Sequence, residues 1–170
     1  MAKTSKLAFP NVSGKVFHSS NINIGKGIAS SRKSRRRRIL LPLHRSQEDK
    51  VQRLINFLQP GTYIRPHKHP GKHDVESIIV MRGSIQFIIF DDIGFIENHF
   101  TLQAGTDESL IDIEPGVWHS FIVLEKDTVI FEVKKGPYNS LTDKEFAFWS
   151  PVEYTDEASK WVESMEKMNE

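Results

Sequence analysis

The chain has no cysteine among its 170 residues, and this absence excludes two kinds of protein. Without thiols there is no disulfide framework and no thiolate metal site, and such a composition suits a reducing compartment. The sequence also lacks an apolar run of roughly 18 residues, the length that crosses a membrane. Residues 1–10 lack the apolar core of a signal peptide. We therefore expect a soluble, cytoplasmic protein.

Positive charge is concentrated at one end of the chain, although the net charge is only +1. Residues 1–50 hold twelve Lys and Arg against two acidic residues, whereas residues 51–170 hold eleven against twenty. Such an asymmetry normally marks a basic arm or an anion site. The run from Arg32 to Arg38 is open to three interpretations: a solvated or structural segment, a phosphate or sugar-nucleotide site, or a nucleic-acid patch. Nucleic acid is the least favoured, because no nucleic-acid-binding motif accompanies the run.

Short apolar segments separated by turn residues fill the middle of the chain and predict an all-β sandwich or barrel. We expect strands at 39–44, 51–59, 62–69, 77–82, 84–90, 95–102, 110–114, 118–124 and 128–134. A chain of this length forms one domain by default. We divide it into a basic N-terminal segment at 1–45, a barrel at 46–153 that includes an aromatic wrapping segment, and a C-terminal helix at 154–170.

Two helices are expected outside the strands. The first begins after Gly27 and runs toward Ile39. The second is an amphipathic helix at 155–168, because Thr155 suits the N-cap position and acidic residues occupy the first turn. Its apolar stripe is predicted to consist of Ala158, Trp161, Val162, Met165 and Met168.

Two histidines separated by one residue, His67 and His69, stand in the expected strand at 62–69. Alternate residues of a strand point to the same side, so both imidazoles can face one interior. Glu76 begins the next apolar run, and His119 follows much later beside the turn at Gly116. Three imidazoles and one carboxylate, delivered from separate strands, are the ingredients of a mononuclear metal site.

These residues resemble the two sequence motifs of the cupin superfamily. The chain matches G-x5-H-x-H at 61–69, E-x6-G at 76–83 and G-x2-H at 116–119. It departs from the pattern in having six residues between His69 and Glu76, so His73 stands as an alternative fourth ligand. The resemblance implies a double-stranded β-helix, the jelly-roll barrel of cupins, with one metal ion held by His67, His69, Glu76 and His119.

Longer blocks are similar to the WbuC family of cupin-fold metalloproteins. They lie at 51–70, 90–94, 131–138 and 143–153, and the resemblance runs from about Arg35 to Glu153. Members of that family occur in surface-polysaccharide (O-antigen) gene neighbourhoods, and the family has no firmly assigned reaction. The resemblance therefore implies fold and metal rather than catalysis. Because cupins commonly dimerise, we also expect a homodimer.

Imidazole and carboxylate ligands suit one divalent transition metal, which could be Fe, Mn, Ni, Co or Zn. Four protein ligands on an octahedral ion leave two open positions. Those positions could bind water, a pair of substrate oxygens or O₂, and the metal could act as a Lewis acid.

Four further polar residues are candidates for a catalytic role: Arg65, Glu132, Tyr63 and Lys134. By strand periodicity Arg65 and Tyr63 share the side of His67. Arg65 could pair with Glu132 or bind a substrate carboxylate or phosphate, and Tyr63 is either a proton donor or a core residue. Glu132 and Lys134 share one face of the last strand, where they either act as acid and base or face solvent.

Three functions fit these features. The first is a metal-dependent enzyme that acts on a sugar or nucleotide-sugar in surface-polysaccharide biosynthesis, by Lewis-acid carbonyl activation of the isomerase or epimerase kind. The second is an Fe(II)-dependent cupin dioxygenase, and the third is a cupin that binds a small ligand without catalysis. In each case the expected partner is a small molecule, and neither nucleic acid nor a membrane is expected.

Overall fold

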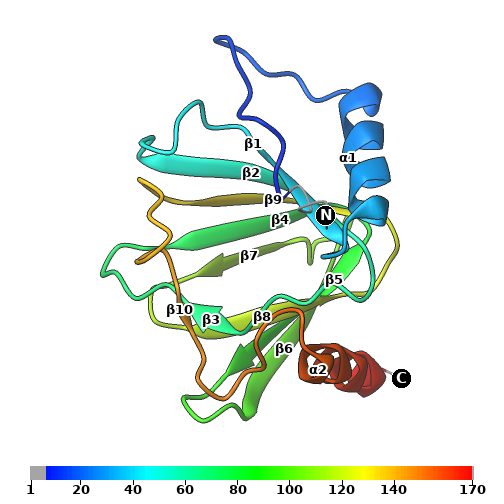
Figure 1. The fold of residues 1–170 in the computed structure, drawn as a ribbon, viewed down its shortest axis with the longest axis vertical. Coiled ribbons are helices and arrows are strands. Elements are labelled where there is room, and N and C mark those ends of the chain that lie inside the picture. Colours follow the sequence, from blue (N-terminus) through cyan, green and yellow to red (C-terminus); the bar gives the residue numbers. More distant parts are fainter. Residues whose placement is uncertain (1–6, 170) are drawn as a thin grey trace, which may run out of the picture.

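The computed structural model describes residues 7–169, so residues 1–6 of the expected N-terminal segment and residue 170 of the expected C-terminal helix lie outside it. A helix stands at each end of a β-structure (Figure 1): α1 at Asn21–Lys33, and α2 at Asp156–Glu166 with the short 3-10 helix η1 at Lys167–Asn169. The described residues form ten strands: β1 Arg38–Pro42, β2 Val51–Leu58, β3 His67–Lys68, β4 Glu76–Arg82, β5 Ser84–Phe90, β6 Ile96–Gln103, β7 Leu110–Ile113, β8 Trp118–Val123, β9 Thr128–Lys135 and β10 Glu145–Phe146.

The strands form two antiparallel sheets within residues 7–169, in the orders β1-β2-β9-β4-β7 and β10-β3-β8-β5-β6. The chain crosses repeatedly from one sheet to the other, as in a jelly roll. Alternation along the strands turns apolar side chains into the space between the sheets. The main core cluster there is Leu58, Ile78, Val80, Ile85, Phe87, Leu102, Ile113, Phe121, Val123 and Ile130. The predicted all-β jelly roll is confirmed.

Helix α1 covers the outer face of the β1-β2-β9 side of the first sheet. Ser20 caps its N-terminus by accepting a hydrogen bond from the Asn23 amide at 3.3 Å. A Cβ atom at Gly27 would lie 2.3 Å from the Phe57 ring, so glycine permits the close approach of helix and sheet. The predicted start after Gly27 and end near Ile39 are both wrong, because the capping serine lies earlier and β1 begins at Arg38.

The strand predicted at 62–69 is mostly wrong, because only His67 and Lys68 pair with neighbouring strands. The C-terminal helix agrees better: the Thr155 hydroxyl accepts from the Ala158 amide at 3.2 Å, as an N-cap does. Met168 is 54% exposed and does not join the predicted apolar stripe. No helix among residues 7–169 is long and apolar enough to cross a membrane.

Candidate metal centre

Four residues converge between the two sheets at one end of the core. His67 on β3 lies directly across from His119 on β8, and His69 follows β3 closely. Glu76 opens β4 in the facing sheet. One possible ligand atom from each of the four lies within 4.8 Å of all the others, and all four residues are buried.

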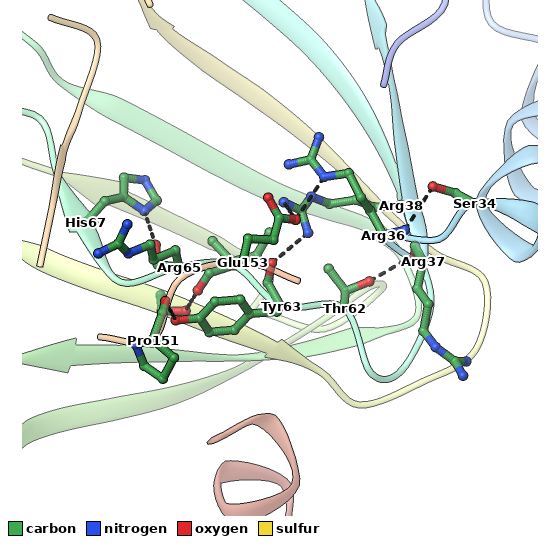
Figure 2. Close-up of polar contacts among 12 residues, drawn as sticks. Ser34, Arg36, Arg37, Arg38, Thr62, Tyr63, Arg65, His67, Pro151 and Glu153 are labelled. Carbon is green, nitrogen blue, oxygen red and sulfur yellow. Dashed lines mark hydrogen bonds and ion pairs between the residues drawn. The ribbon is translucent and has the colours of Figure 1, made fainter. Parts of the chain in front are cut away.

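Each of the three histidines is oriented by a backbone carbonyl at its Nδ1 atom. The acceptors are the carbonyl oxygens of Arg65 (2.8 Å from His67), Asp143 (beside His69) and Val117 (2.9 Å from His119). Figure 2 shows the first of these bonds. A carbonyl oxygen only accepts, so Nδ1 carries the proton and the Nε2 lone pair is left to face the interior. Metal-binding histidines are held in this way.

The Nε2 atoms of His69 and His119 are buried and have no hydrogen-bond partner. They lie 3.5 and 3.2 Å from the same carboxylate oxygen of Glu76. A nitrogen lone pair and a carboxylate oxygen that face each other repel unless a cation lies between them. The donor set therefore suits a divalent metal ion.

The surroundings fix these side chains in place. The Gly116 amide donates to the His69 carbonyl at 2.9 Å and joins the turns that carry two of the histidines. Gly116 has φ +85°, a conformation that favours glycine. The Phe87 ring stacks on the His119 imidazole with 5.5 Å between centroids. The turn at Gly116 and the packing of Phe87 therefore fix the positions of His69 and His119.

The long gap after His69 forms a turn that carries His73 away from the cluster. Asp74 closes the turn, because its amide donates to the Gly71 carbonyl at 2.9 Å and its carboxylate accepts from the Gly71 amide at 3.0 Å. His73 is exposed, whereas Glu76 is 4% exposed. Of the two candidates for the fourth ligand, the structure brings Glu76 to the histidines and leaves His73 outside.

Glu132 and Lys134 face the interior from β9, so the alternative in which they face solvent is wrong. Glu132 accepts a hydrogen bond from Asn56 at 2.9 Å. Burial and the nearby Glu76 charge raise the pKa of Glu132 to about 7. The Lys134 ammonium lies 2.7 Å from both carboxylate oxygens of Asp143. A carboxyl group that exchanges its proton near neutrality therefore stands next to the cluster.

Arg65 and Tyr63 do not point into the cluster, because the backbone before His67 is not a strand. The Arg65 guanidinium donates to the Ser150 hydroxyl at 3.0 Å and lies over the Phe146 ring. The ion pair with Glu132 that periodicity suggested is absent from the described residues. The Tyr63 hydroxyl donates to the Pro151 carbonyl at 2.7 Å (Figure 2), and burial raises the pKa of Tyr63 to about 12. Tyr63 is placed as a core residue.

Sequence reasoning missed Lys144. Its Nζ atom lies 3.4 Å from Nε2 of His67. The segment that carries it runs from the end of β9 to β10, which pairs with β3 (Figure 1). A two-residue strand leaves no periodic signal, so only the position of Lys144 in the block at 143–153 could have drawn attention to it.

A pocket of about 510 Å³ opens beside the cluster. Its wall includes His69, Lys134 and Asp143, together with parts of the loops at 70–75 and 135–142. Space for a ligand larger than water therefore adjoins one of the histidines.

The basic run at 32–38 is largely engaged by the chain itself. Arg36 and Arg38 donate to the Glu153 carboxylate at 2.9 and 2.8 Å, and Figure 2 shows all three together. Arg32 forms an ion pair with Asp127. These contacts favour the structural interpretation of the run over the phosphate and nucleic-acid interpretations.

A family model described as "Domain of unknown function (DUF6016)" matches residues 21–102, just under half of the chain. No curated protein matches the sequence.

Solved structures of similar fold include CapF with the inhibitor 3-isopropenyl-tropolone, at a TM-score of 0.51 and 16% identity over 63% of this chain and 30% of that one. Oxalate decarboxylase from Bacillus subtilis at pH 4.6 aligns with a TM-score of 0.49 and 18% identity, over 64% and 27%. The Lactobacillus farciminis oxalate decarboxylase formate complex aligns at 0.45 and 20%, over 58% and 27%. The chain thus covers less than a third of the length of each of these proteins.

At these identities the likeness concerns the fold alone. Together with the sheet topology, the likeness to CapF confirms the cupin jelly roll. The chain is a cupin-fold protein with a buried His/Glu cluster that suits a divalent metal. The resemblance to the WbuC family stays a prediction.

Proposed function

We propose that this protein is a metal-dependent enzyme whose single divalent ion is held by His67, His69, Glu76 and His119. The proposed substrate is a sugar or nucleotide-sugar, and the proposed reaction is isomerisation or epimerisation next to a carbonyl group. One observation carries the proposal: imidazole nitrogens and a carboxylate, all buried, converge on one point, and two of the nitrogens have no other partner.

The bound metal would supply Lewis-acid polarisation of a substrate carbonyl oxygen. The chain itself supplies a candidate proton-transfer group in Glu132. Its carboxyl group lies beside Glu76 without belonging to the proposed ligand set, so it is available to accept and donate a proton. Asn56 holds its carboxyl group by a hydrogen bond of 2.9 Å. We therefore assign Glu132 the removal and return of a proton at the carbon beside the substrate carbonyl.

The pocket beside His69 supports a substrate that carries both apolar and polar groups. Its wall is largely apolar but includes hydrogen-bonding groups such as Asn139 and Thr142, and an ion pair between Lys135 and Asp74. Hydroxyl groups of a sugar find donors and acceptors there.

The test starts from protein loaded separately with Fe, Mn, Ni, Co or Zn, with the metal content measured by elemental analysis. Each form is incubated in D₂O with a panel of nucleotide-sugars and followed by NMR. We expect deuterium incorporation next to a carbonyl, or a new sugar isomer, with at least one metal. The matched variant Glu132→Gln should keep its metal and lose the exchange.

If no metal-loaded form binds or converts any nucleotide-sugar, the proposed substrate class is refuted. An oxygen electrode run in parallel on the Fe(II) form tests the alternative, because O₂ uptake would replace the isomerase proposal by a dioxygenase. The homodimer and the cytoplasmic location stay predictions.

A further inference from the structure

Lys144 is held over the metal centre by contacts on both sides. Asp143, the preceding residue, lies beside the His69 imidazole through its carbonyl and binds Lys134 through its carboxylate. On the other side, β10 pairs with β3 so that Phe146 lies opposite His67. This leaves the Lys144 Nζ atom 3.4 Å from Nε2 of His67. A long flexible side chain is thus directed at the cluster by a fixed backbone.

The amine of Lys144 forms no direct ion pair in the described part of the chain. Neighbouring Lys134 is different, because it contacts both oxygens of Asp143. No carboxylate of residues 7–169 forms an ion pair with Lys144. A partly buried lysine normally forms a direct ion pair with an acid, whereas Glu76, Asp143 and Glu132 act on the charge of Lys144 only from beyond ion-pair distance.

Metal binding makes the lack of a direct ion pair at Lys144 more important. Among the four proposed ligands only Glu76 is anionic, so a divalent ion leaves the centre with an excess of about one positive charge. An ammonium beside such a centre is repelled, and the repulsion is strong where water is partly excluded. An anionic group that lies between the metal ion and the Lys144 ammonium attracts both of them and so offsets their repulsion.

We propose that Lys144 binds an oxyanion, a carboxylate or a phosphate group, of the same ligand that occupies the open coordination positions of the metal. This inference rests on the proposed function and narrows its substrate class to anionic small molecules. The adjoining pocket beside His69 and Lys134 has room for the remainder of such a molecule. Lys144 is then a residue that selects substrates by charge.

Two small probes of similar size separate charge from shape. Glycolate carries a carboxylate and a hydroxyl group, whereas ethylene glycol carries two hydroxyl groups and no charge. Each is titrated into Co²⁺-loaded protein, with calorimetry for affinity and the visible absorption of Co²⁺ for a change at the metal. Inorganic phosphate forms a third arm, and the tighter of the two anions identifies the kind of oxyanion that is preferred.

The variant Lys144→Met keeps the length of the side chain and removes its charge, and Lys144→Arg keeps the charge. We expect Lys144→Met to weaken glycolate binding about tenfold or more, the range for a charge-assisted hydrogen bond. Lys144→Arg should retain most of the affinity. The control Lys135→Met removes a charge at the pocket rim, where Lys135 pairs with Asp74, and should change glycolate affinity by no more than about twofold.

The affinity for Co²⁺ in the absence of glycolate and phosphate gives a second readout, and the change expected in it has the opposite sign to the change in glycolate affinity. Lys144→Met should bind Co²⁺ as tightly as the wild type or more tightly, because a repelling charge has been removed. A purely structural role for Lys144 would instead lower metal affinity and the thermal midpoint together.

Equal binding of glycolate and ethylene glycol, or unchanged glycolate affinity in Lys144→Met, overturns this inference while the metal centre stands. Wild-type protein that takes up no Co²⁺ by elemental analysis overturns the proposed function and the inference with it. The two failures are therefore distinguished before any probe is added.

Discussion

Two polar clusters in this molecule bring together side chains from distant parts of the sequence, yet they differ in how their charges are satisfied. The arginine clamp, which we define as Arg36, Arg38 and Glu153, is closed: each guanidinium donates to the same carboxylate. Arg38 also donates to the Tyr63 carbonyl at 2.6 Å. The metal centre is open, because nitrogens of His69 and His119 lack hydrogen-bond partners. A cluster whose charges pair with one another stabilises the fold, whereas a cluster with unpartnered ligand atoms is suited to bind a metal ion.

An unpartnered nitrogen is not sufficient for a site. Nε2 of His44 is also buried without a hydrogen bond. In the described residues, however, His44 belongs to no group of converging ligand atoms. Convergence of several donors therefore distinguishes the metal centre from a core histidine.

The largest expected effect is on the metal centre. His119→Ala removes a ligand that comes from β8, so the metal content should fall from about one ion per chain to near background. His119 is buried and stacks on Phe87 of the core, so the variant also loses some packing energy, which unfolding without metal measures separately. Elemental analysis measures the metal, and thermal unfolding with and without added metal measures the lost stabilisation.

The matched control is His73→Ala, which removes an exposed histidine from the neighbouring turn. It should keep its metal. Full metal content in His119→Ala, or metal loss in His73→Ala, would mean that the proposed ligand set is incorrect.

The sequence was sufficient to predict the pieces of the metal centre that lie on regular strands or next to turn glycines. The spacing of His67 and His69 and the positions of Glu76 and His119 were visible as motifs. The direction of Arg65 was not, because irregular backbone at 62–66 breaks the alternation on which that prediction depended. Strand periodicity gives side-chain direction only where a strand exists.

The arginine clamp offers the second-largest effect. Glu153→Gln keeps the shape of the side chain and removes the charge that Arg36 and Arg38 share. Burial already lowers the pKa of Arg38 to about 10 even with Glu153 present. The Glu153 side chain is 27% exposed, so we expect a loss of about 2–4 kcal/mol in unfolding free energy, somewhat below that for a fully buried pair. Urea unfolding measures the loss.

Glu145→Gln is the control for this variant. Its carboxylate pairs with Lys68 at 3.5 Å and its side chain is 53% exposed, so the expected loss is below about 1 kcal/mol. Metal content should be unchanged in Glu153→Gln, and a loss of metal there would show that the two clusters are coupled.

The composition of the basic run does not indicate which acidic residues its arginines pair with. The excess of arginine at the start of the chain resembled an anion site because its acidic partners, Asp127 and Glu153, lie far away in sequence. Nothing local indicates a pairing over such separations, since Asp127 reaches Arg32 from the turn before β9 and Glu153 reaches Arg36 and Arg38 from the segment before α2. Lys144 was missed for the same reason, because β10 brings it to His67 from a distant part of the chain.

The smallest expected effect concerns His44, which shares the burial of the metal-centre histidines but not their convergence. Its side chain is 1% exposed, and burial lowers its pKa from the ordinary 6.5. The unfolded chain therefore binds a proton as the pH falls below about 6.5, while folded His44 stays neutral to a lower pH. The stability that His44 contributes is fully present above pH 6.5 and is lost as the pH falls through the lowered pKa.

Urea unfolding at pH 7.5 and 5.5, with chelator present, should show a smaller acid-induced loss in His44→Gln than in the wild type. Equal losses would contradict this, and restoration by added metal would assign the pH dependence to the metal centre instead.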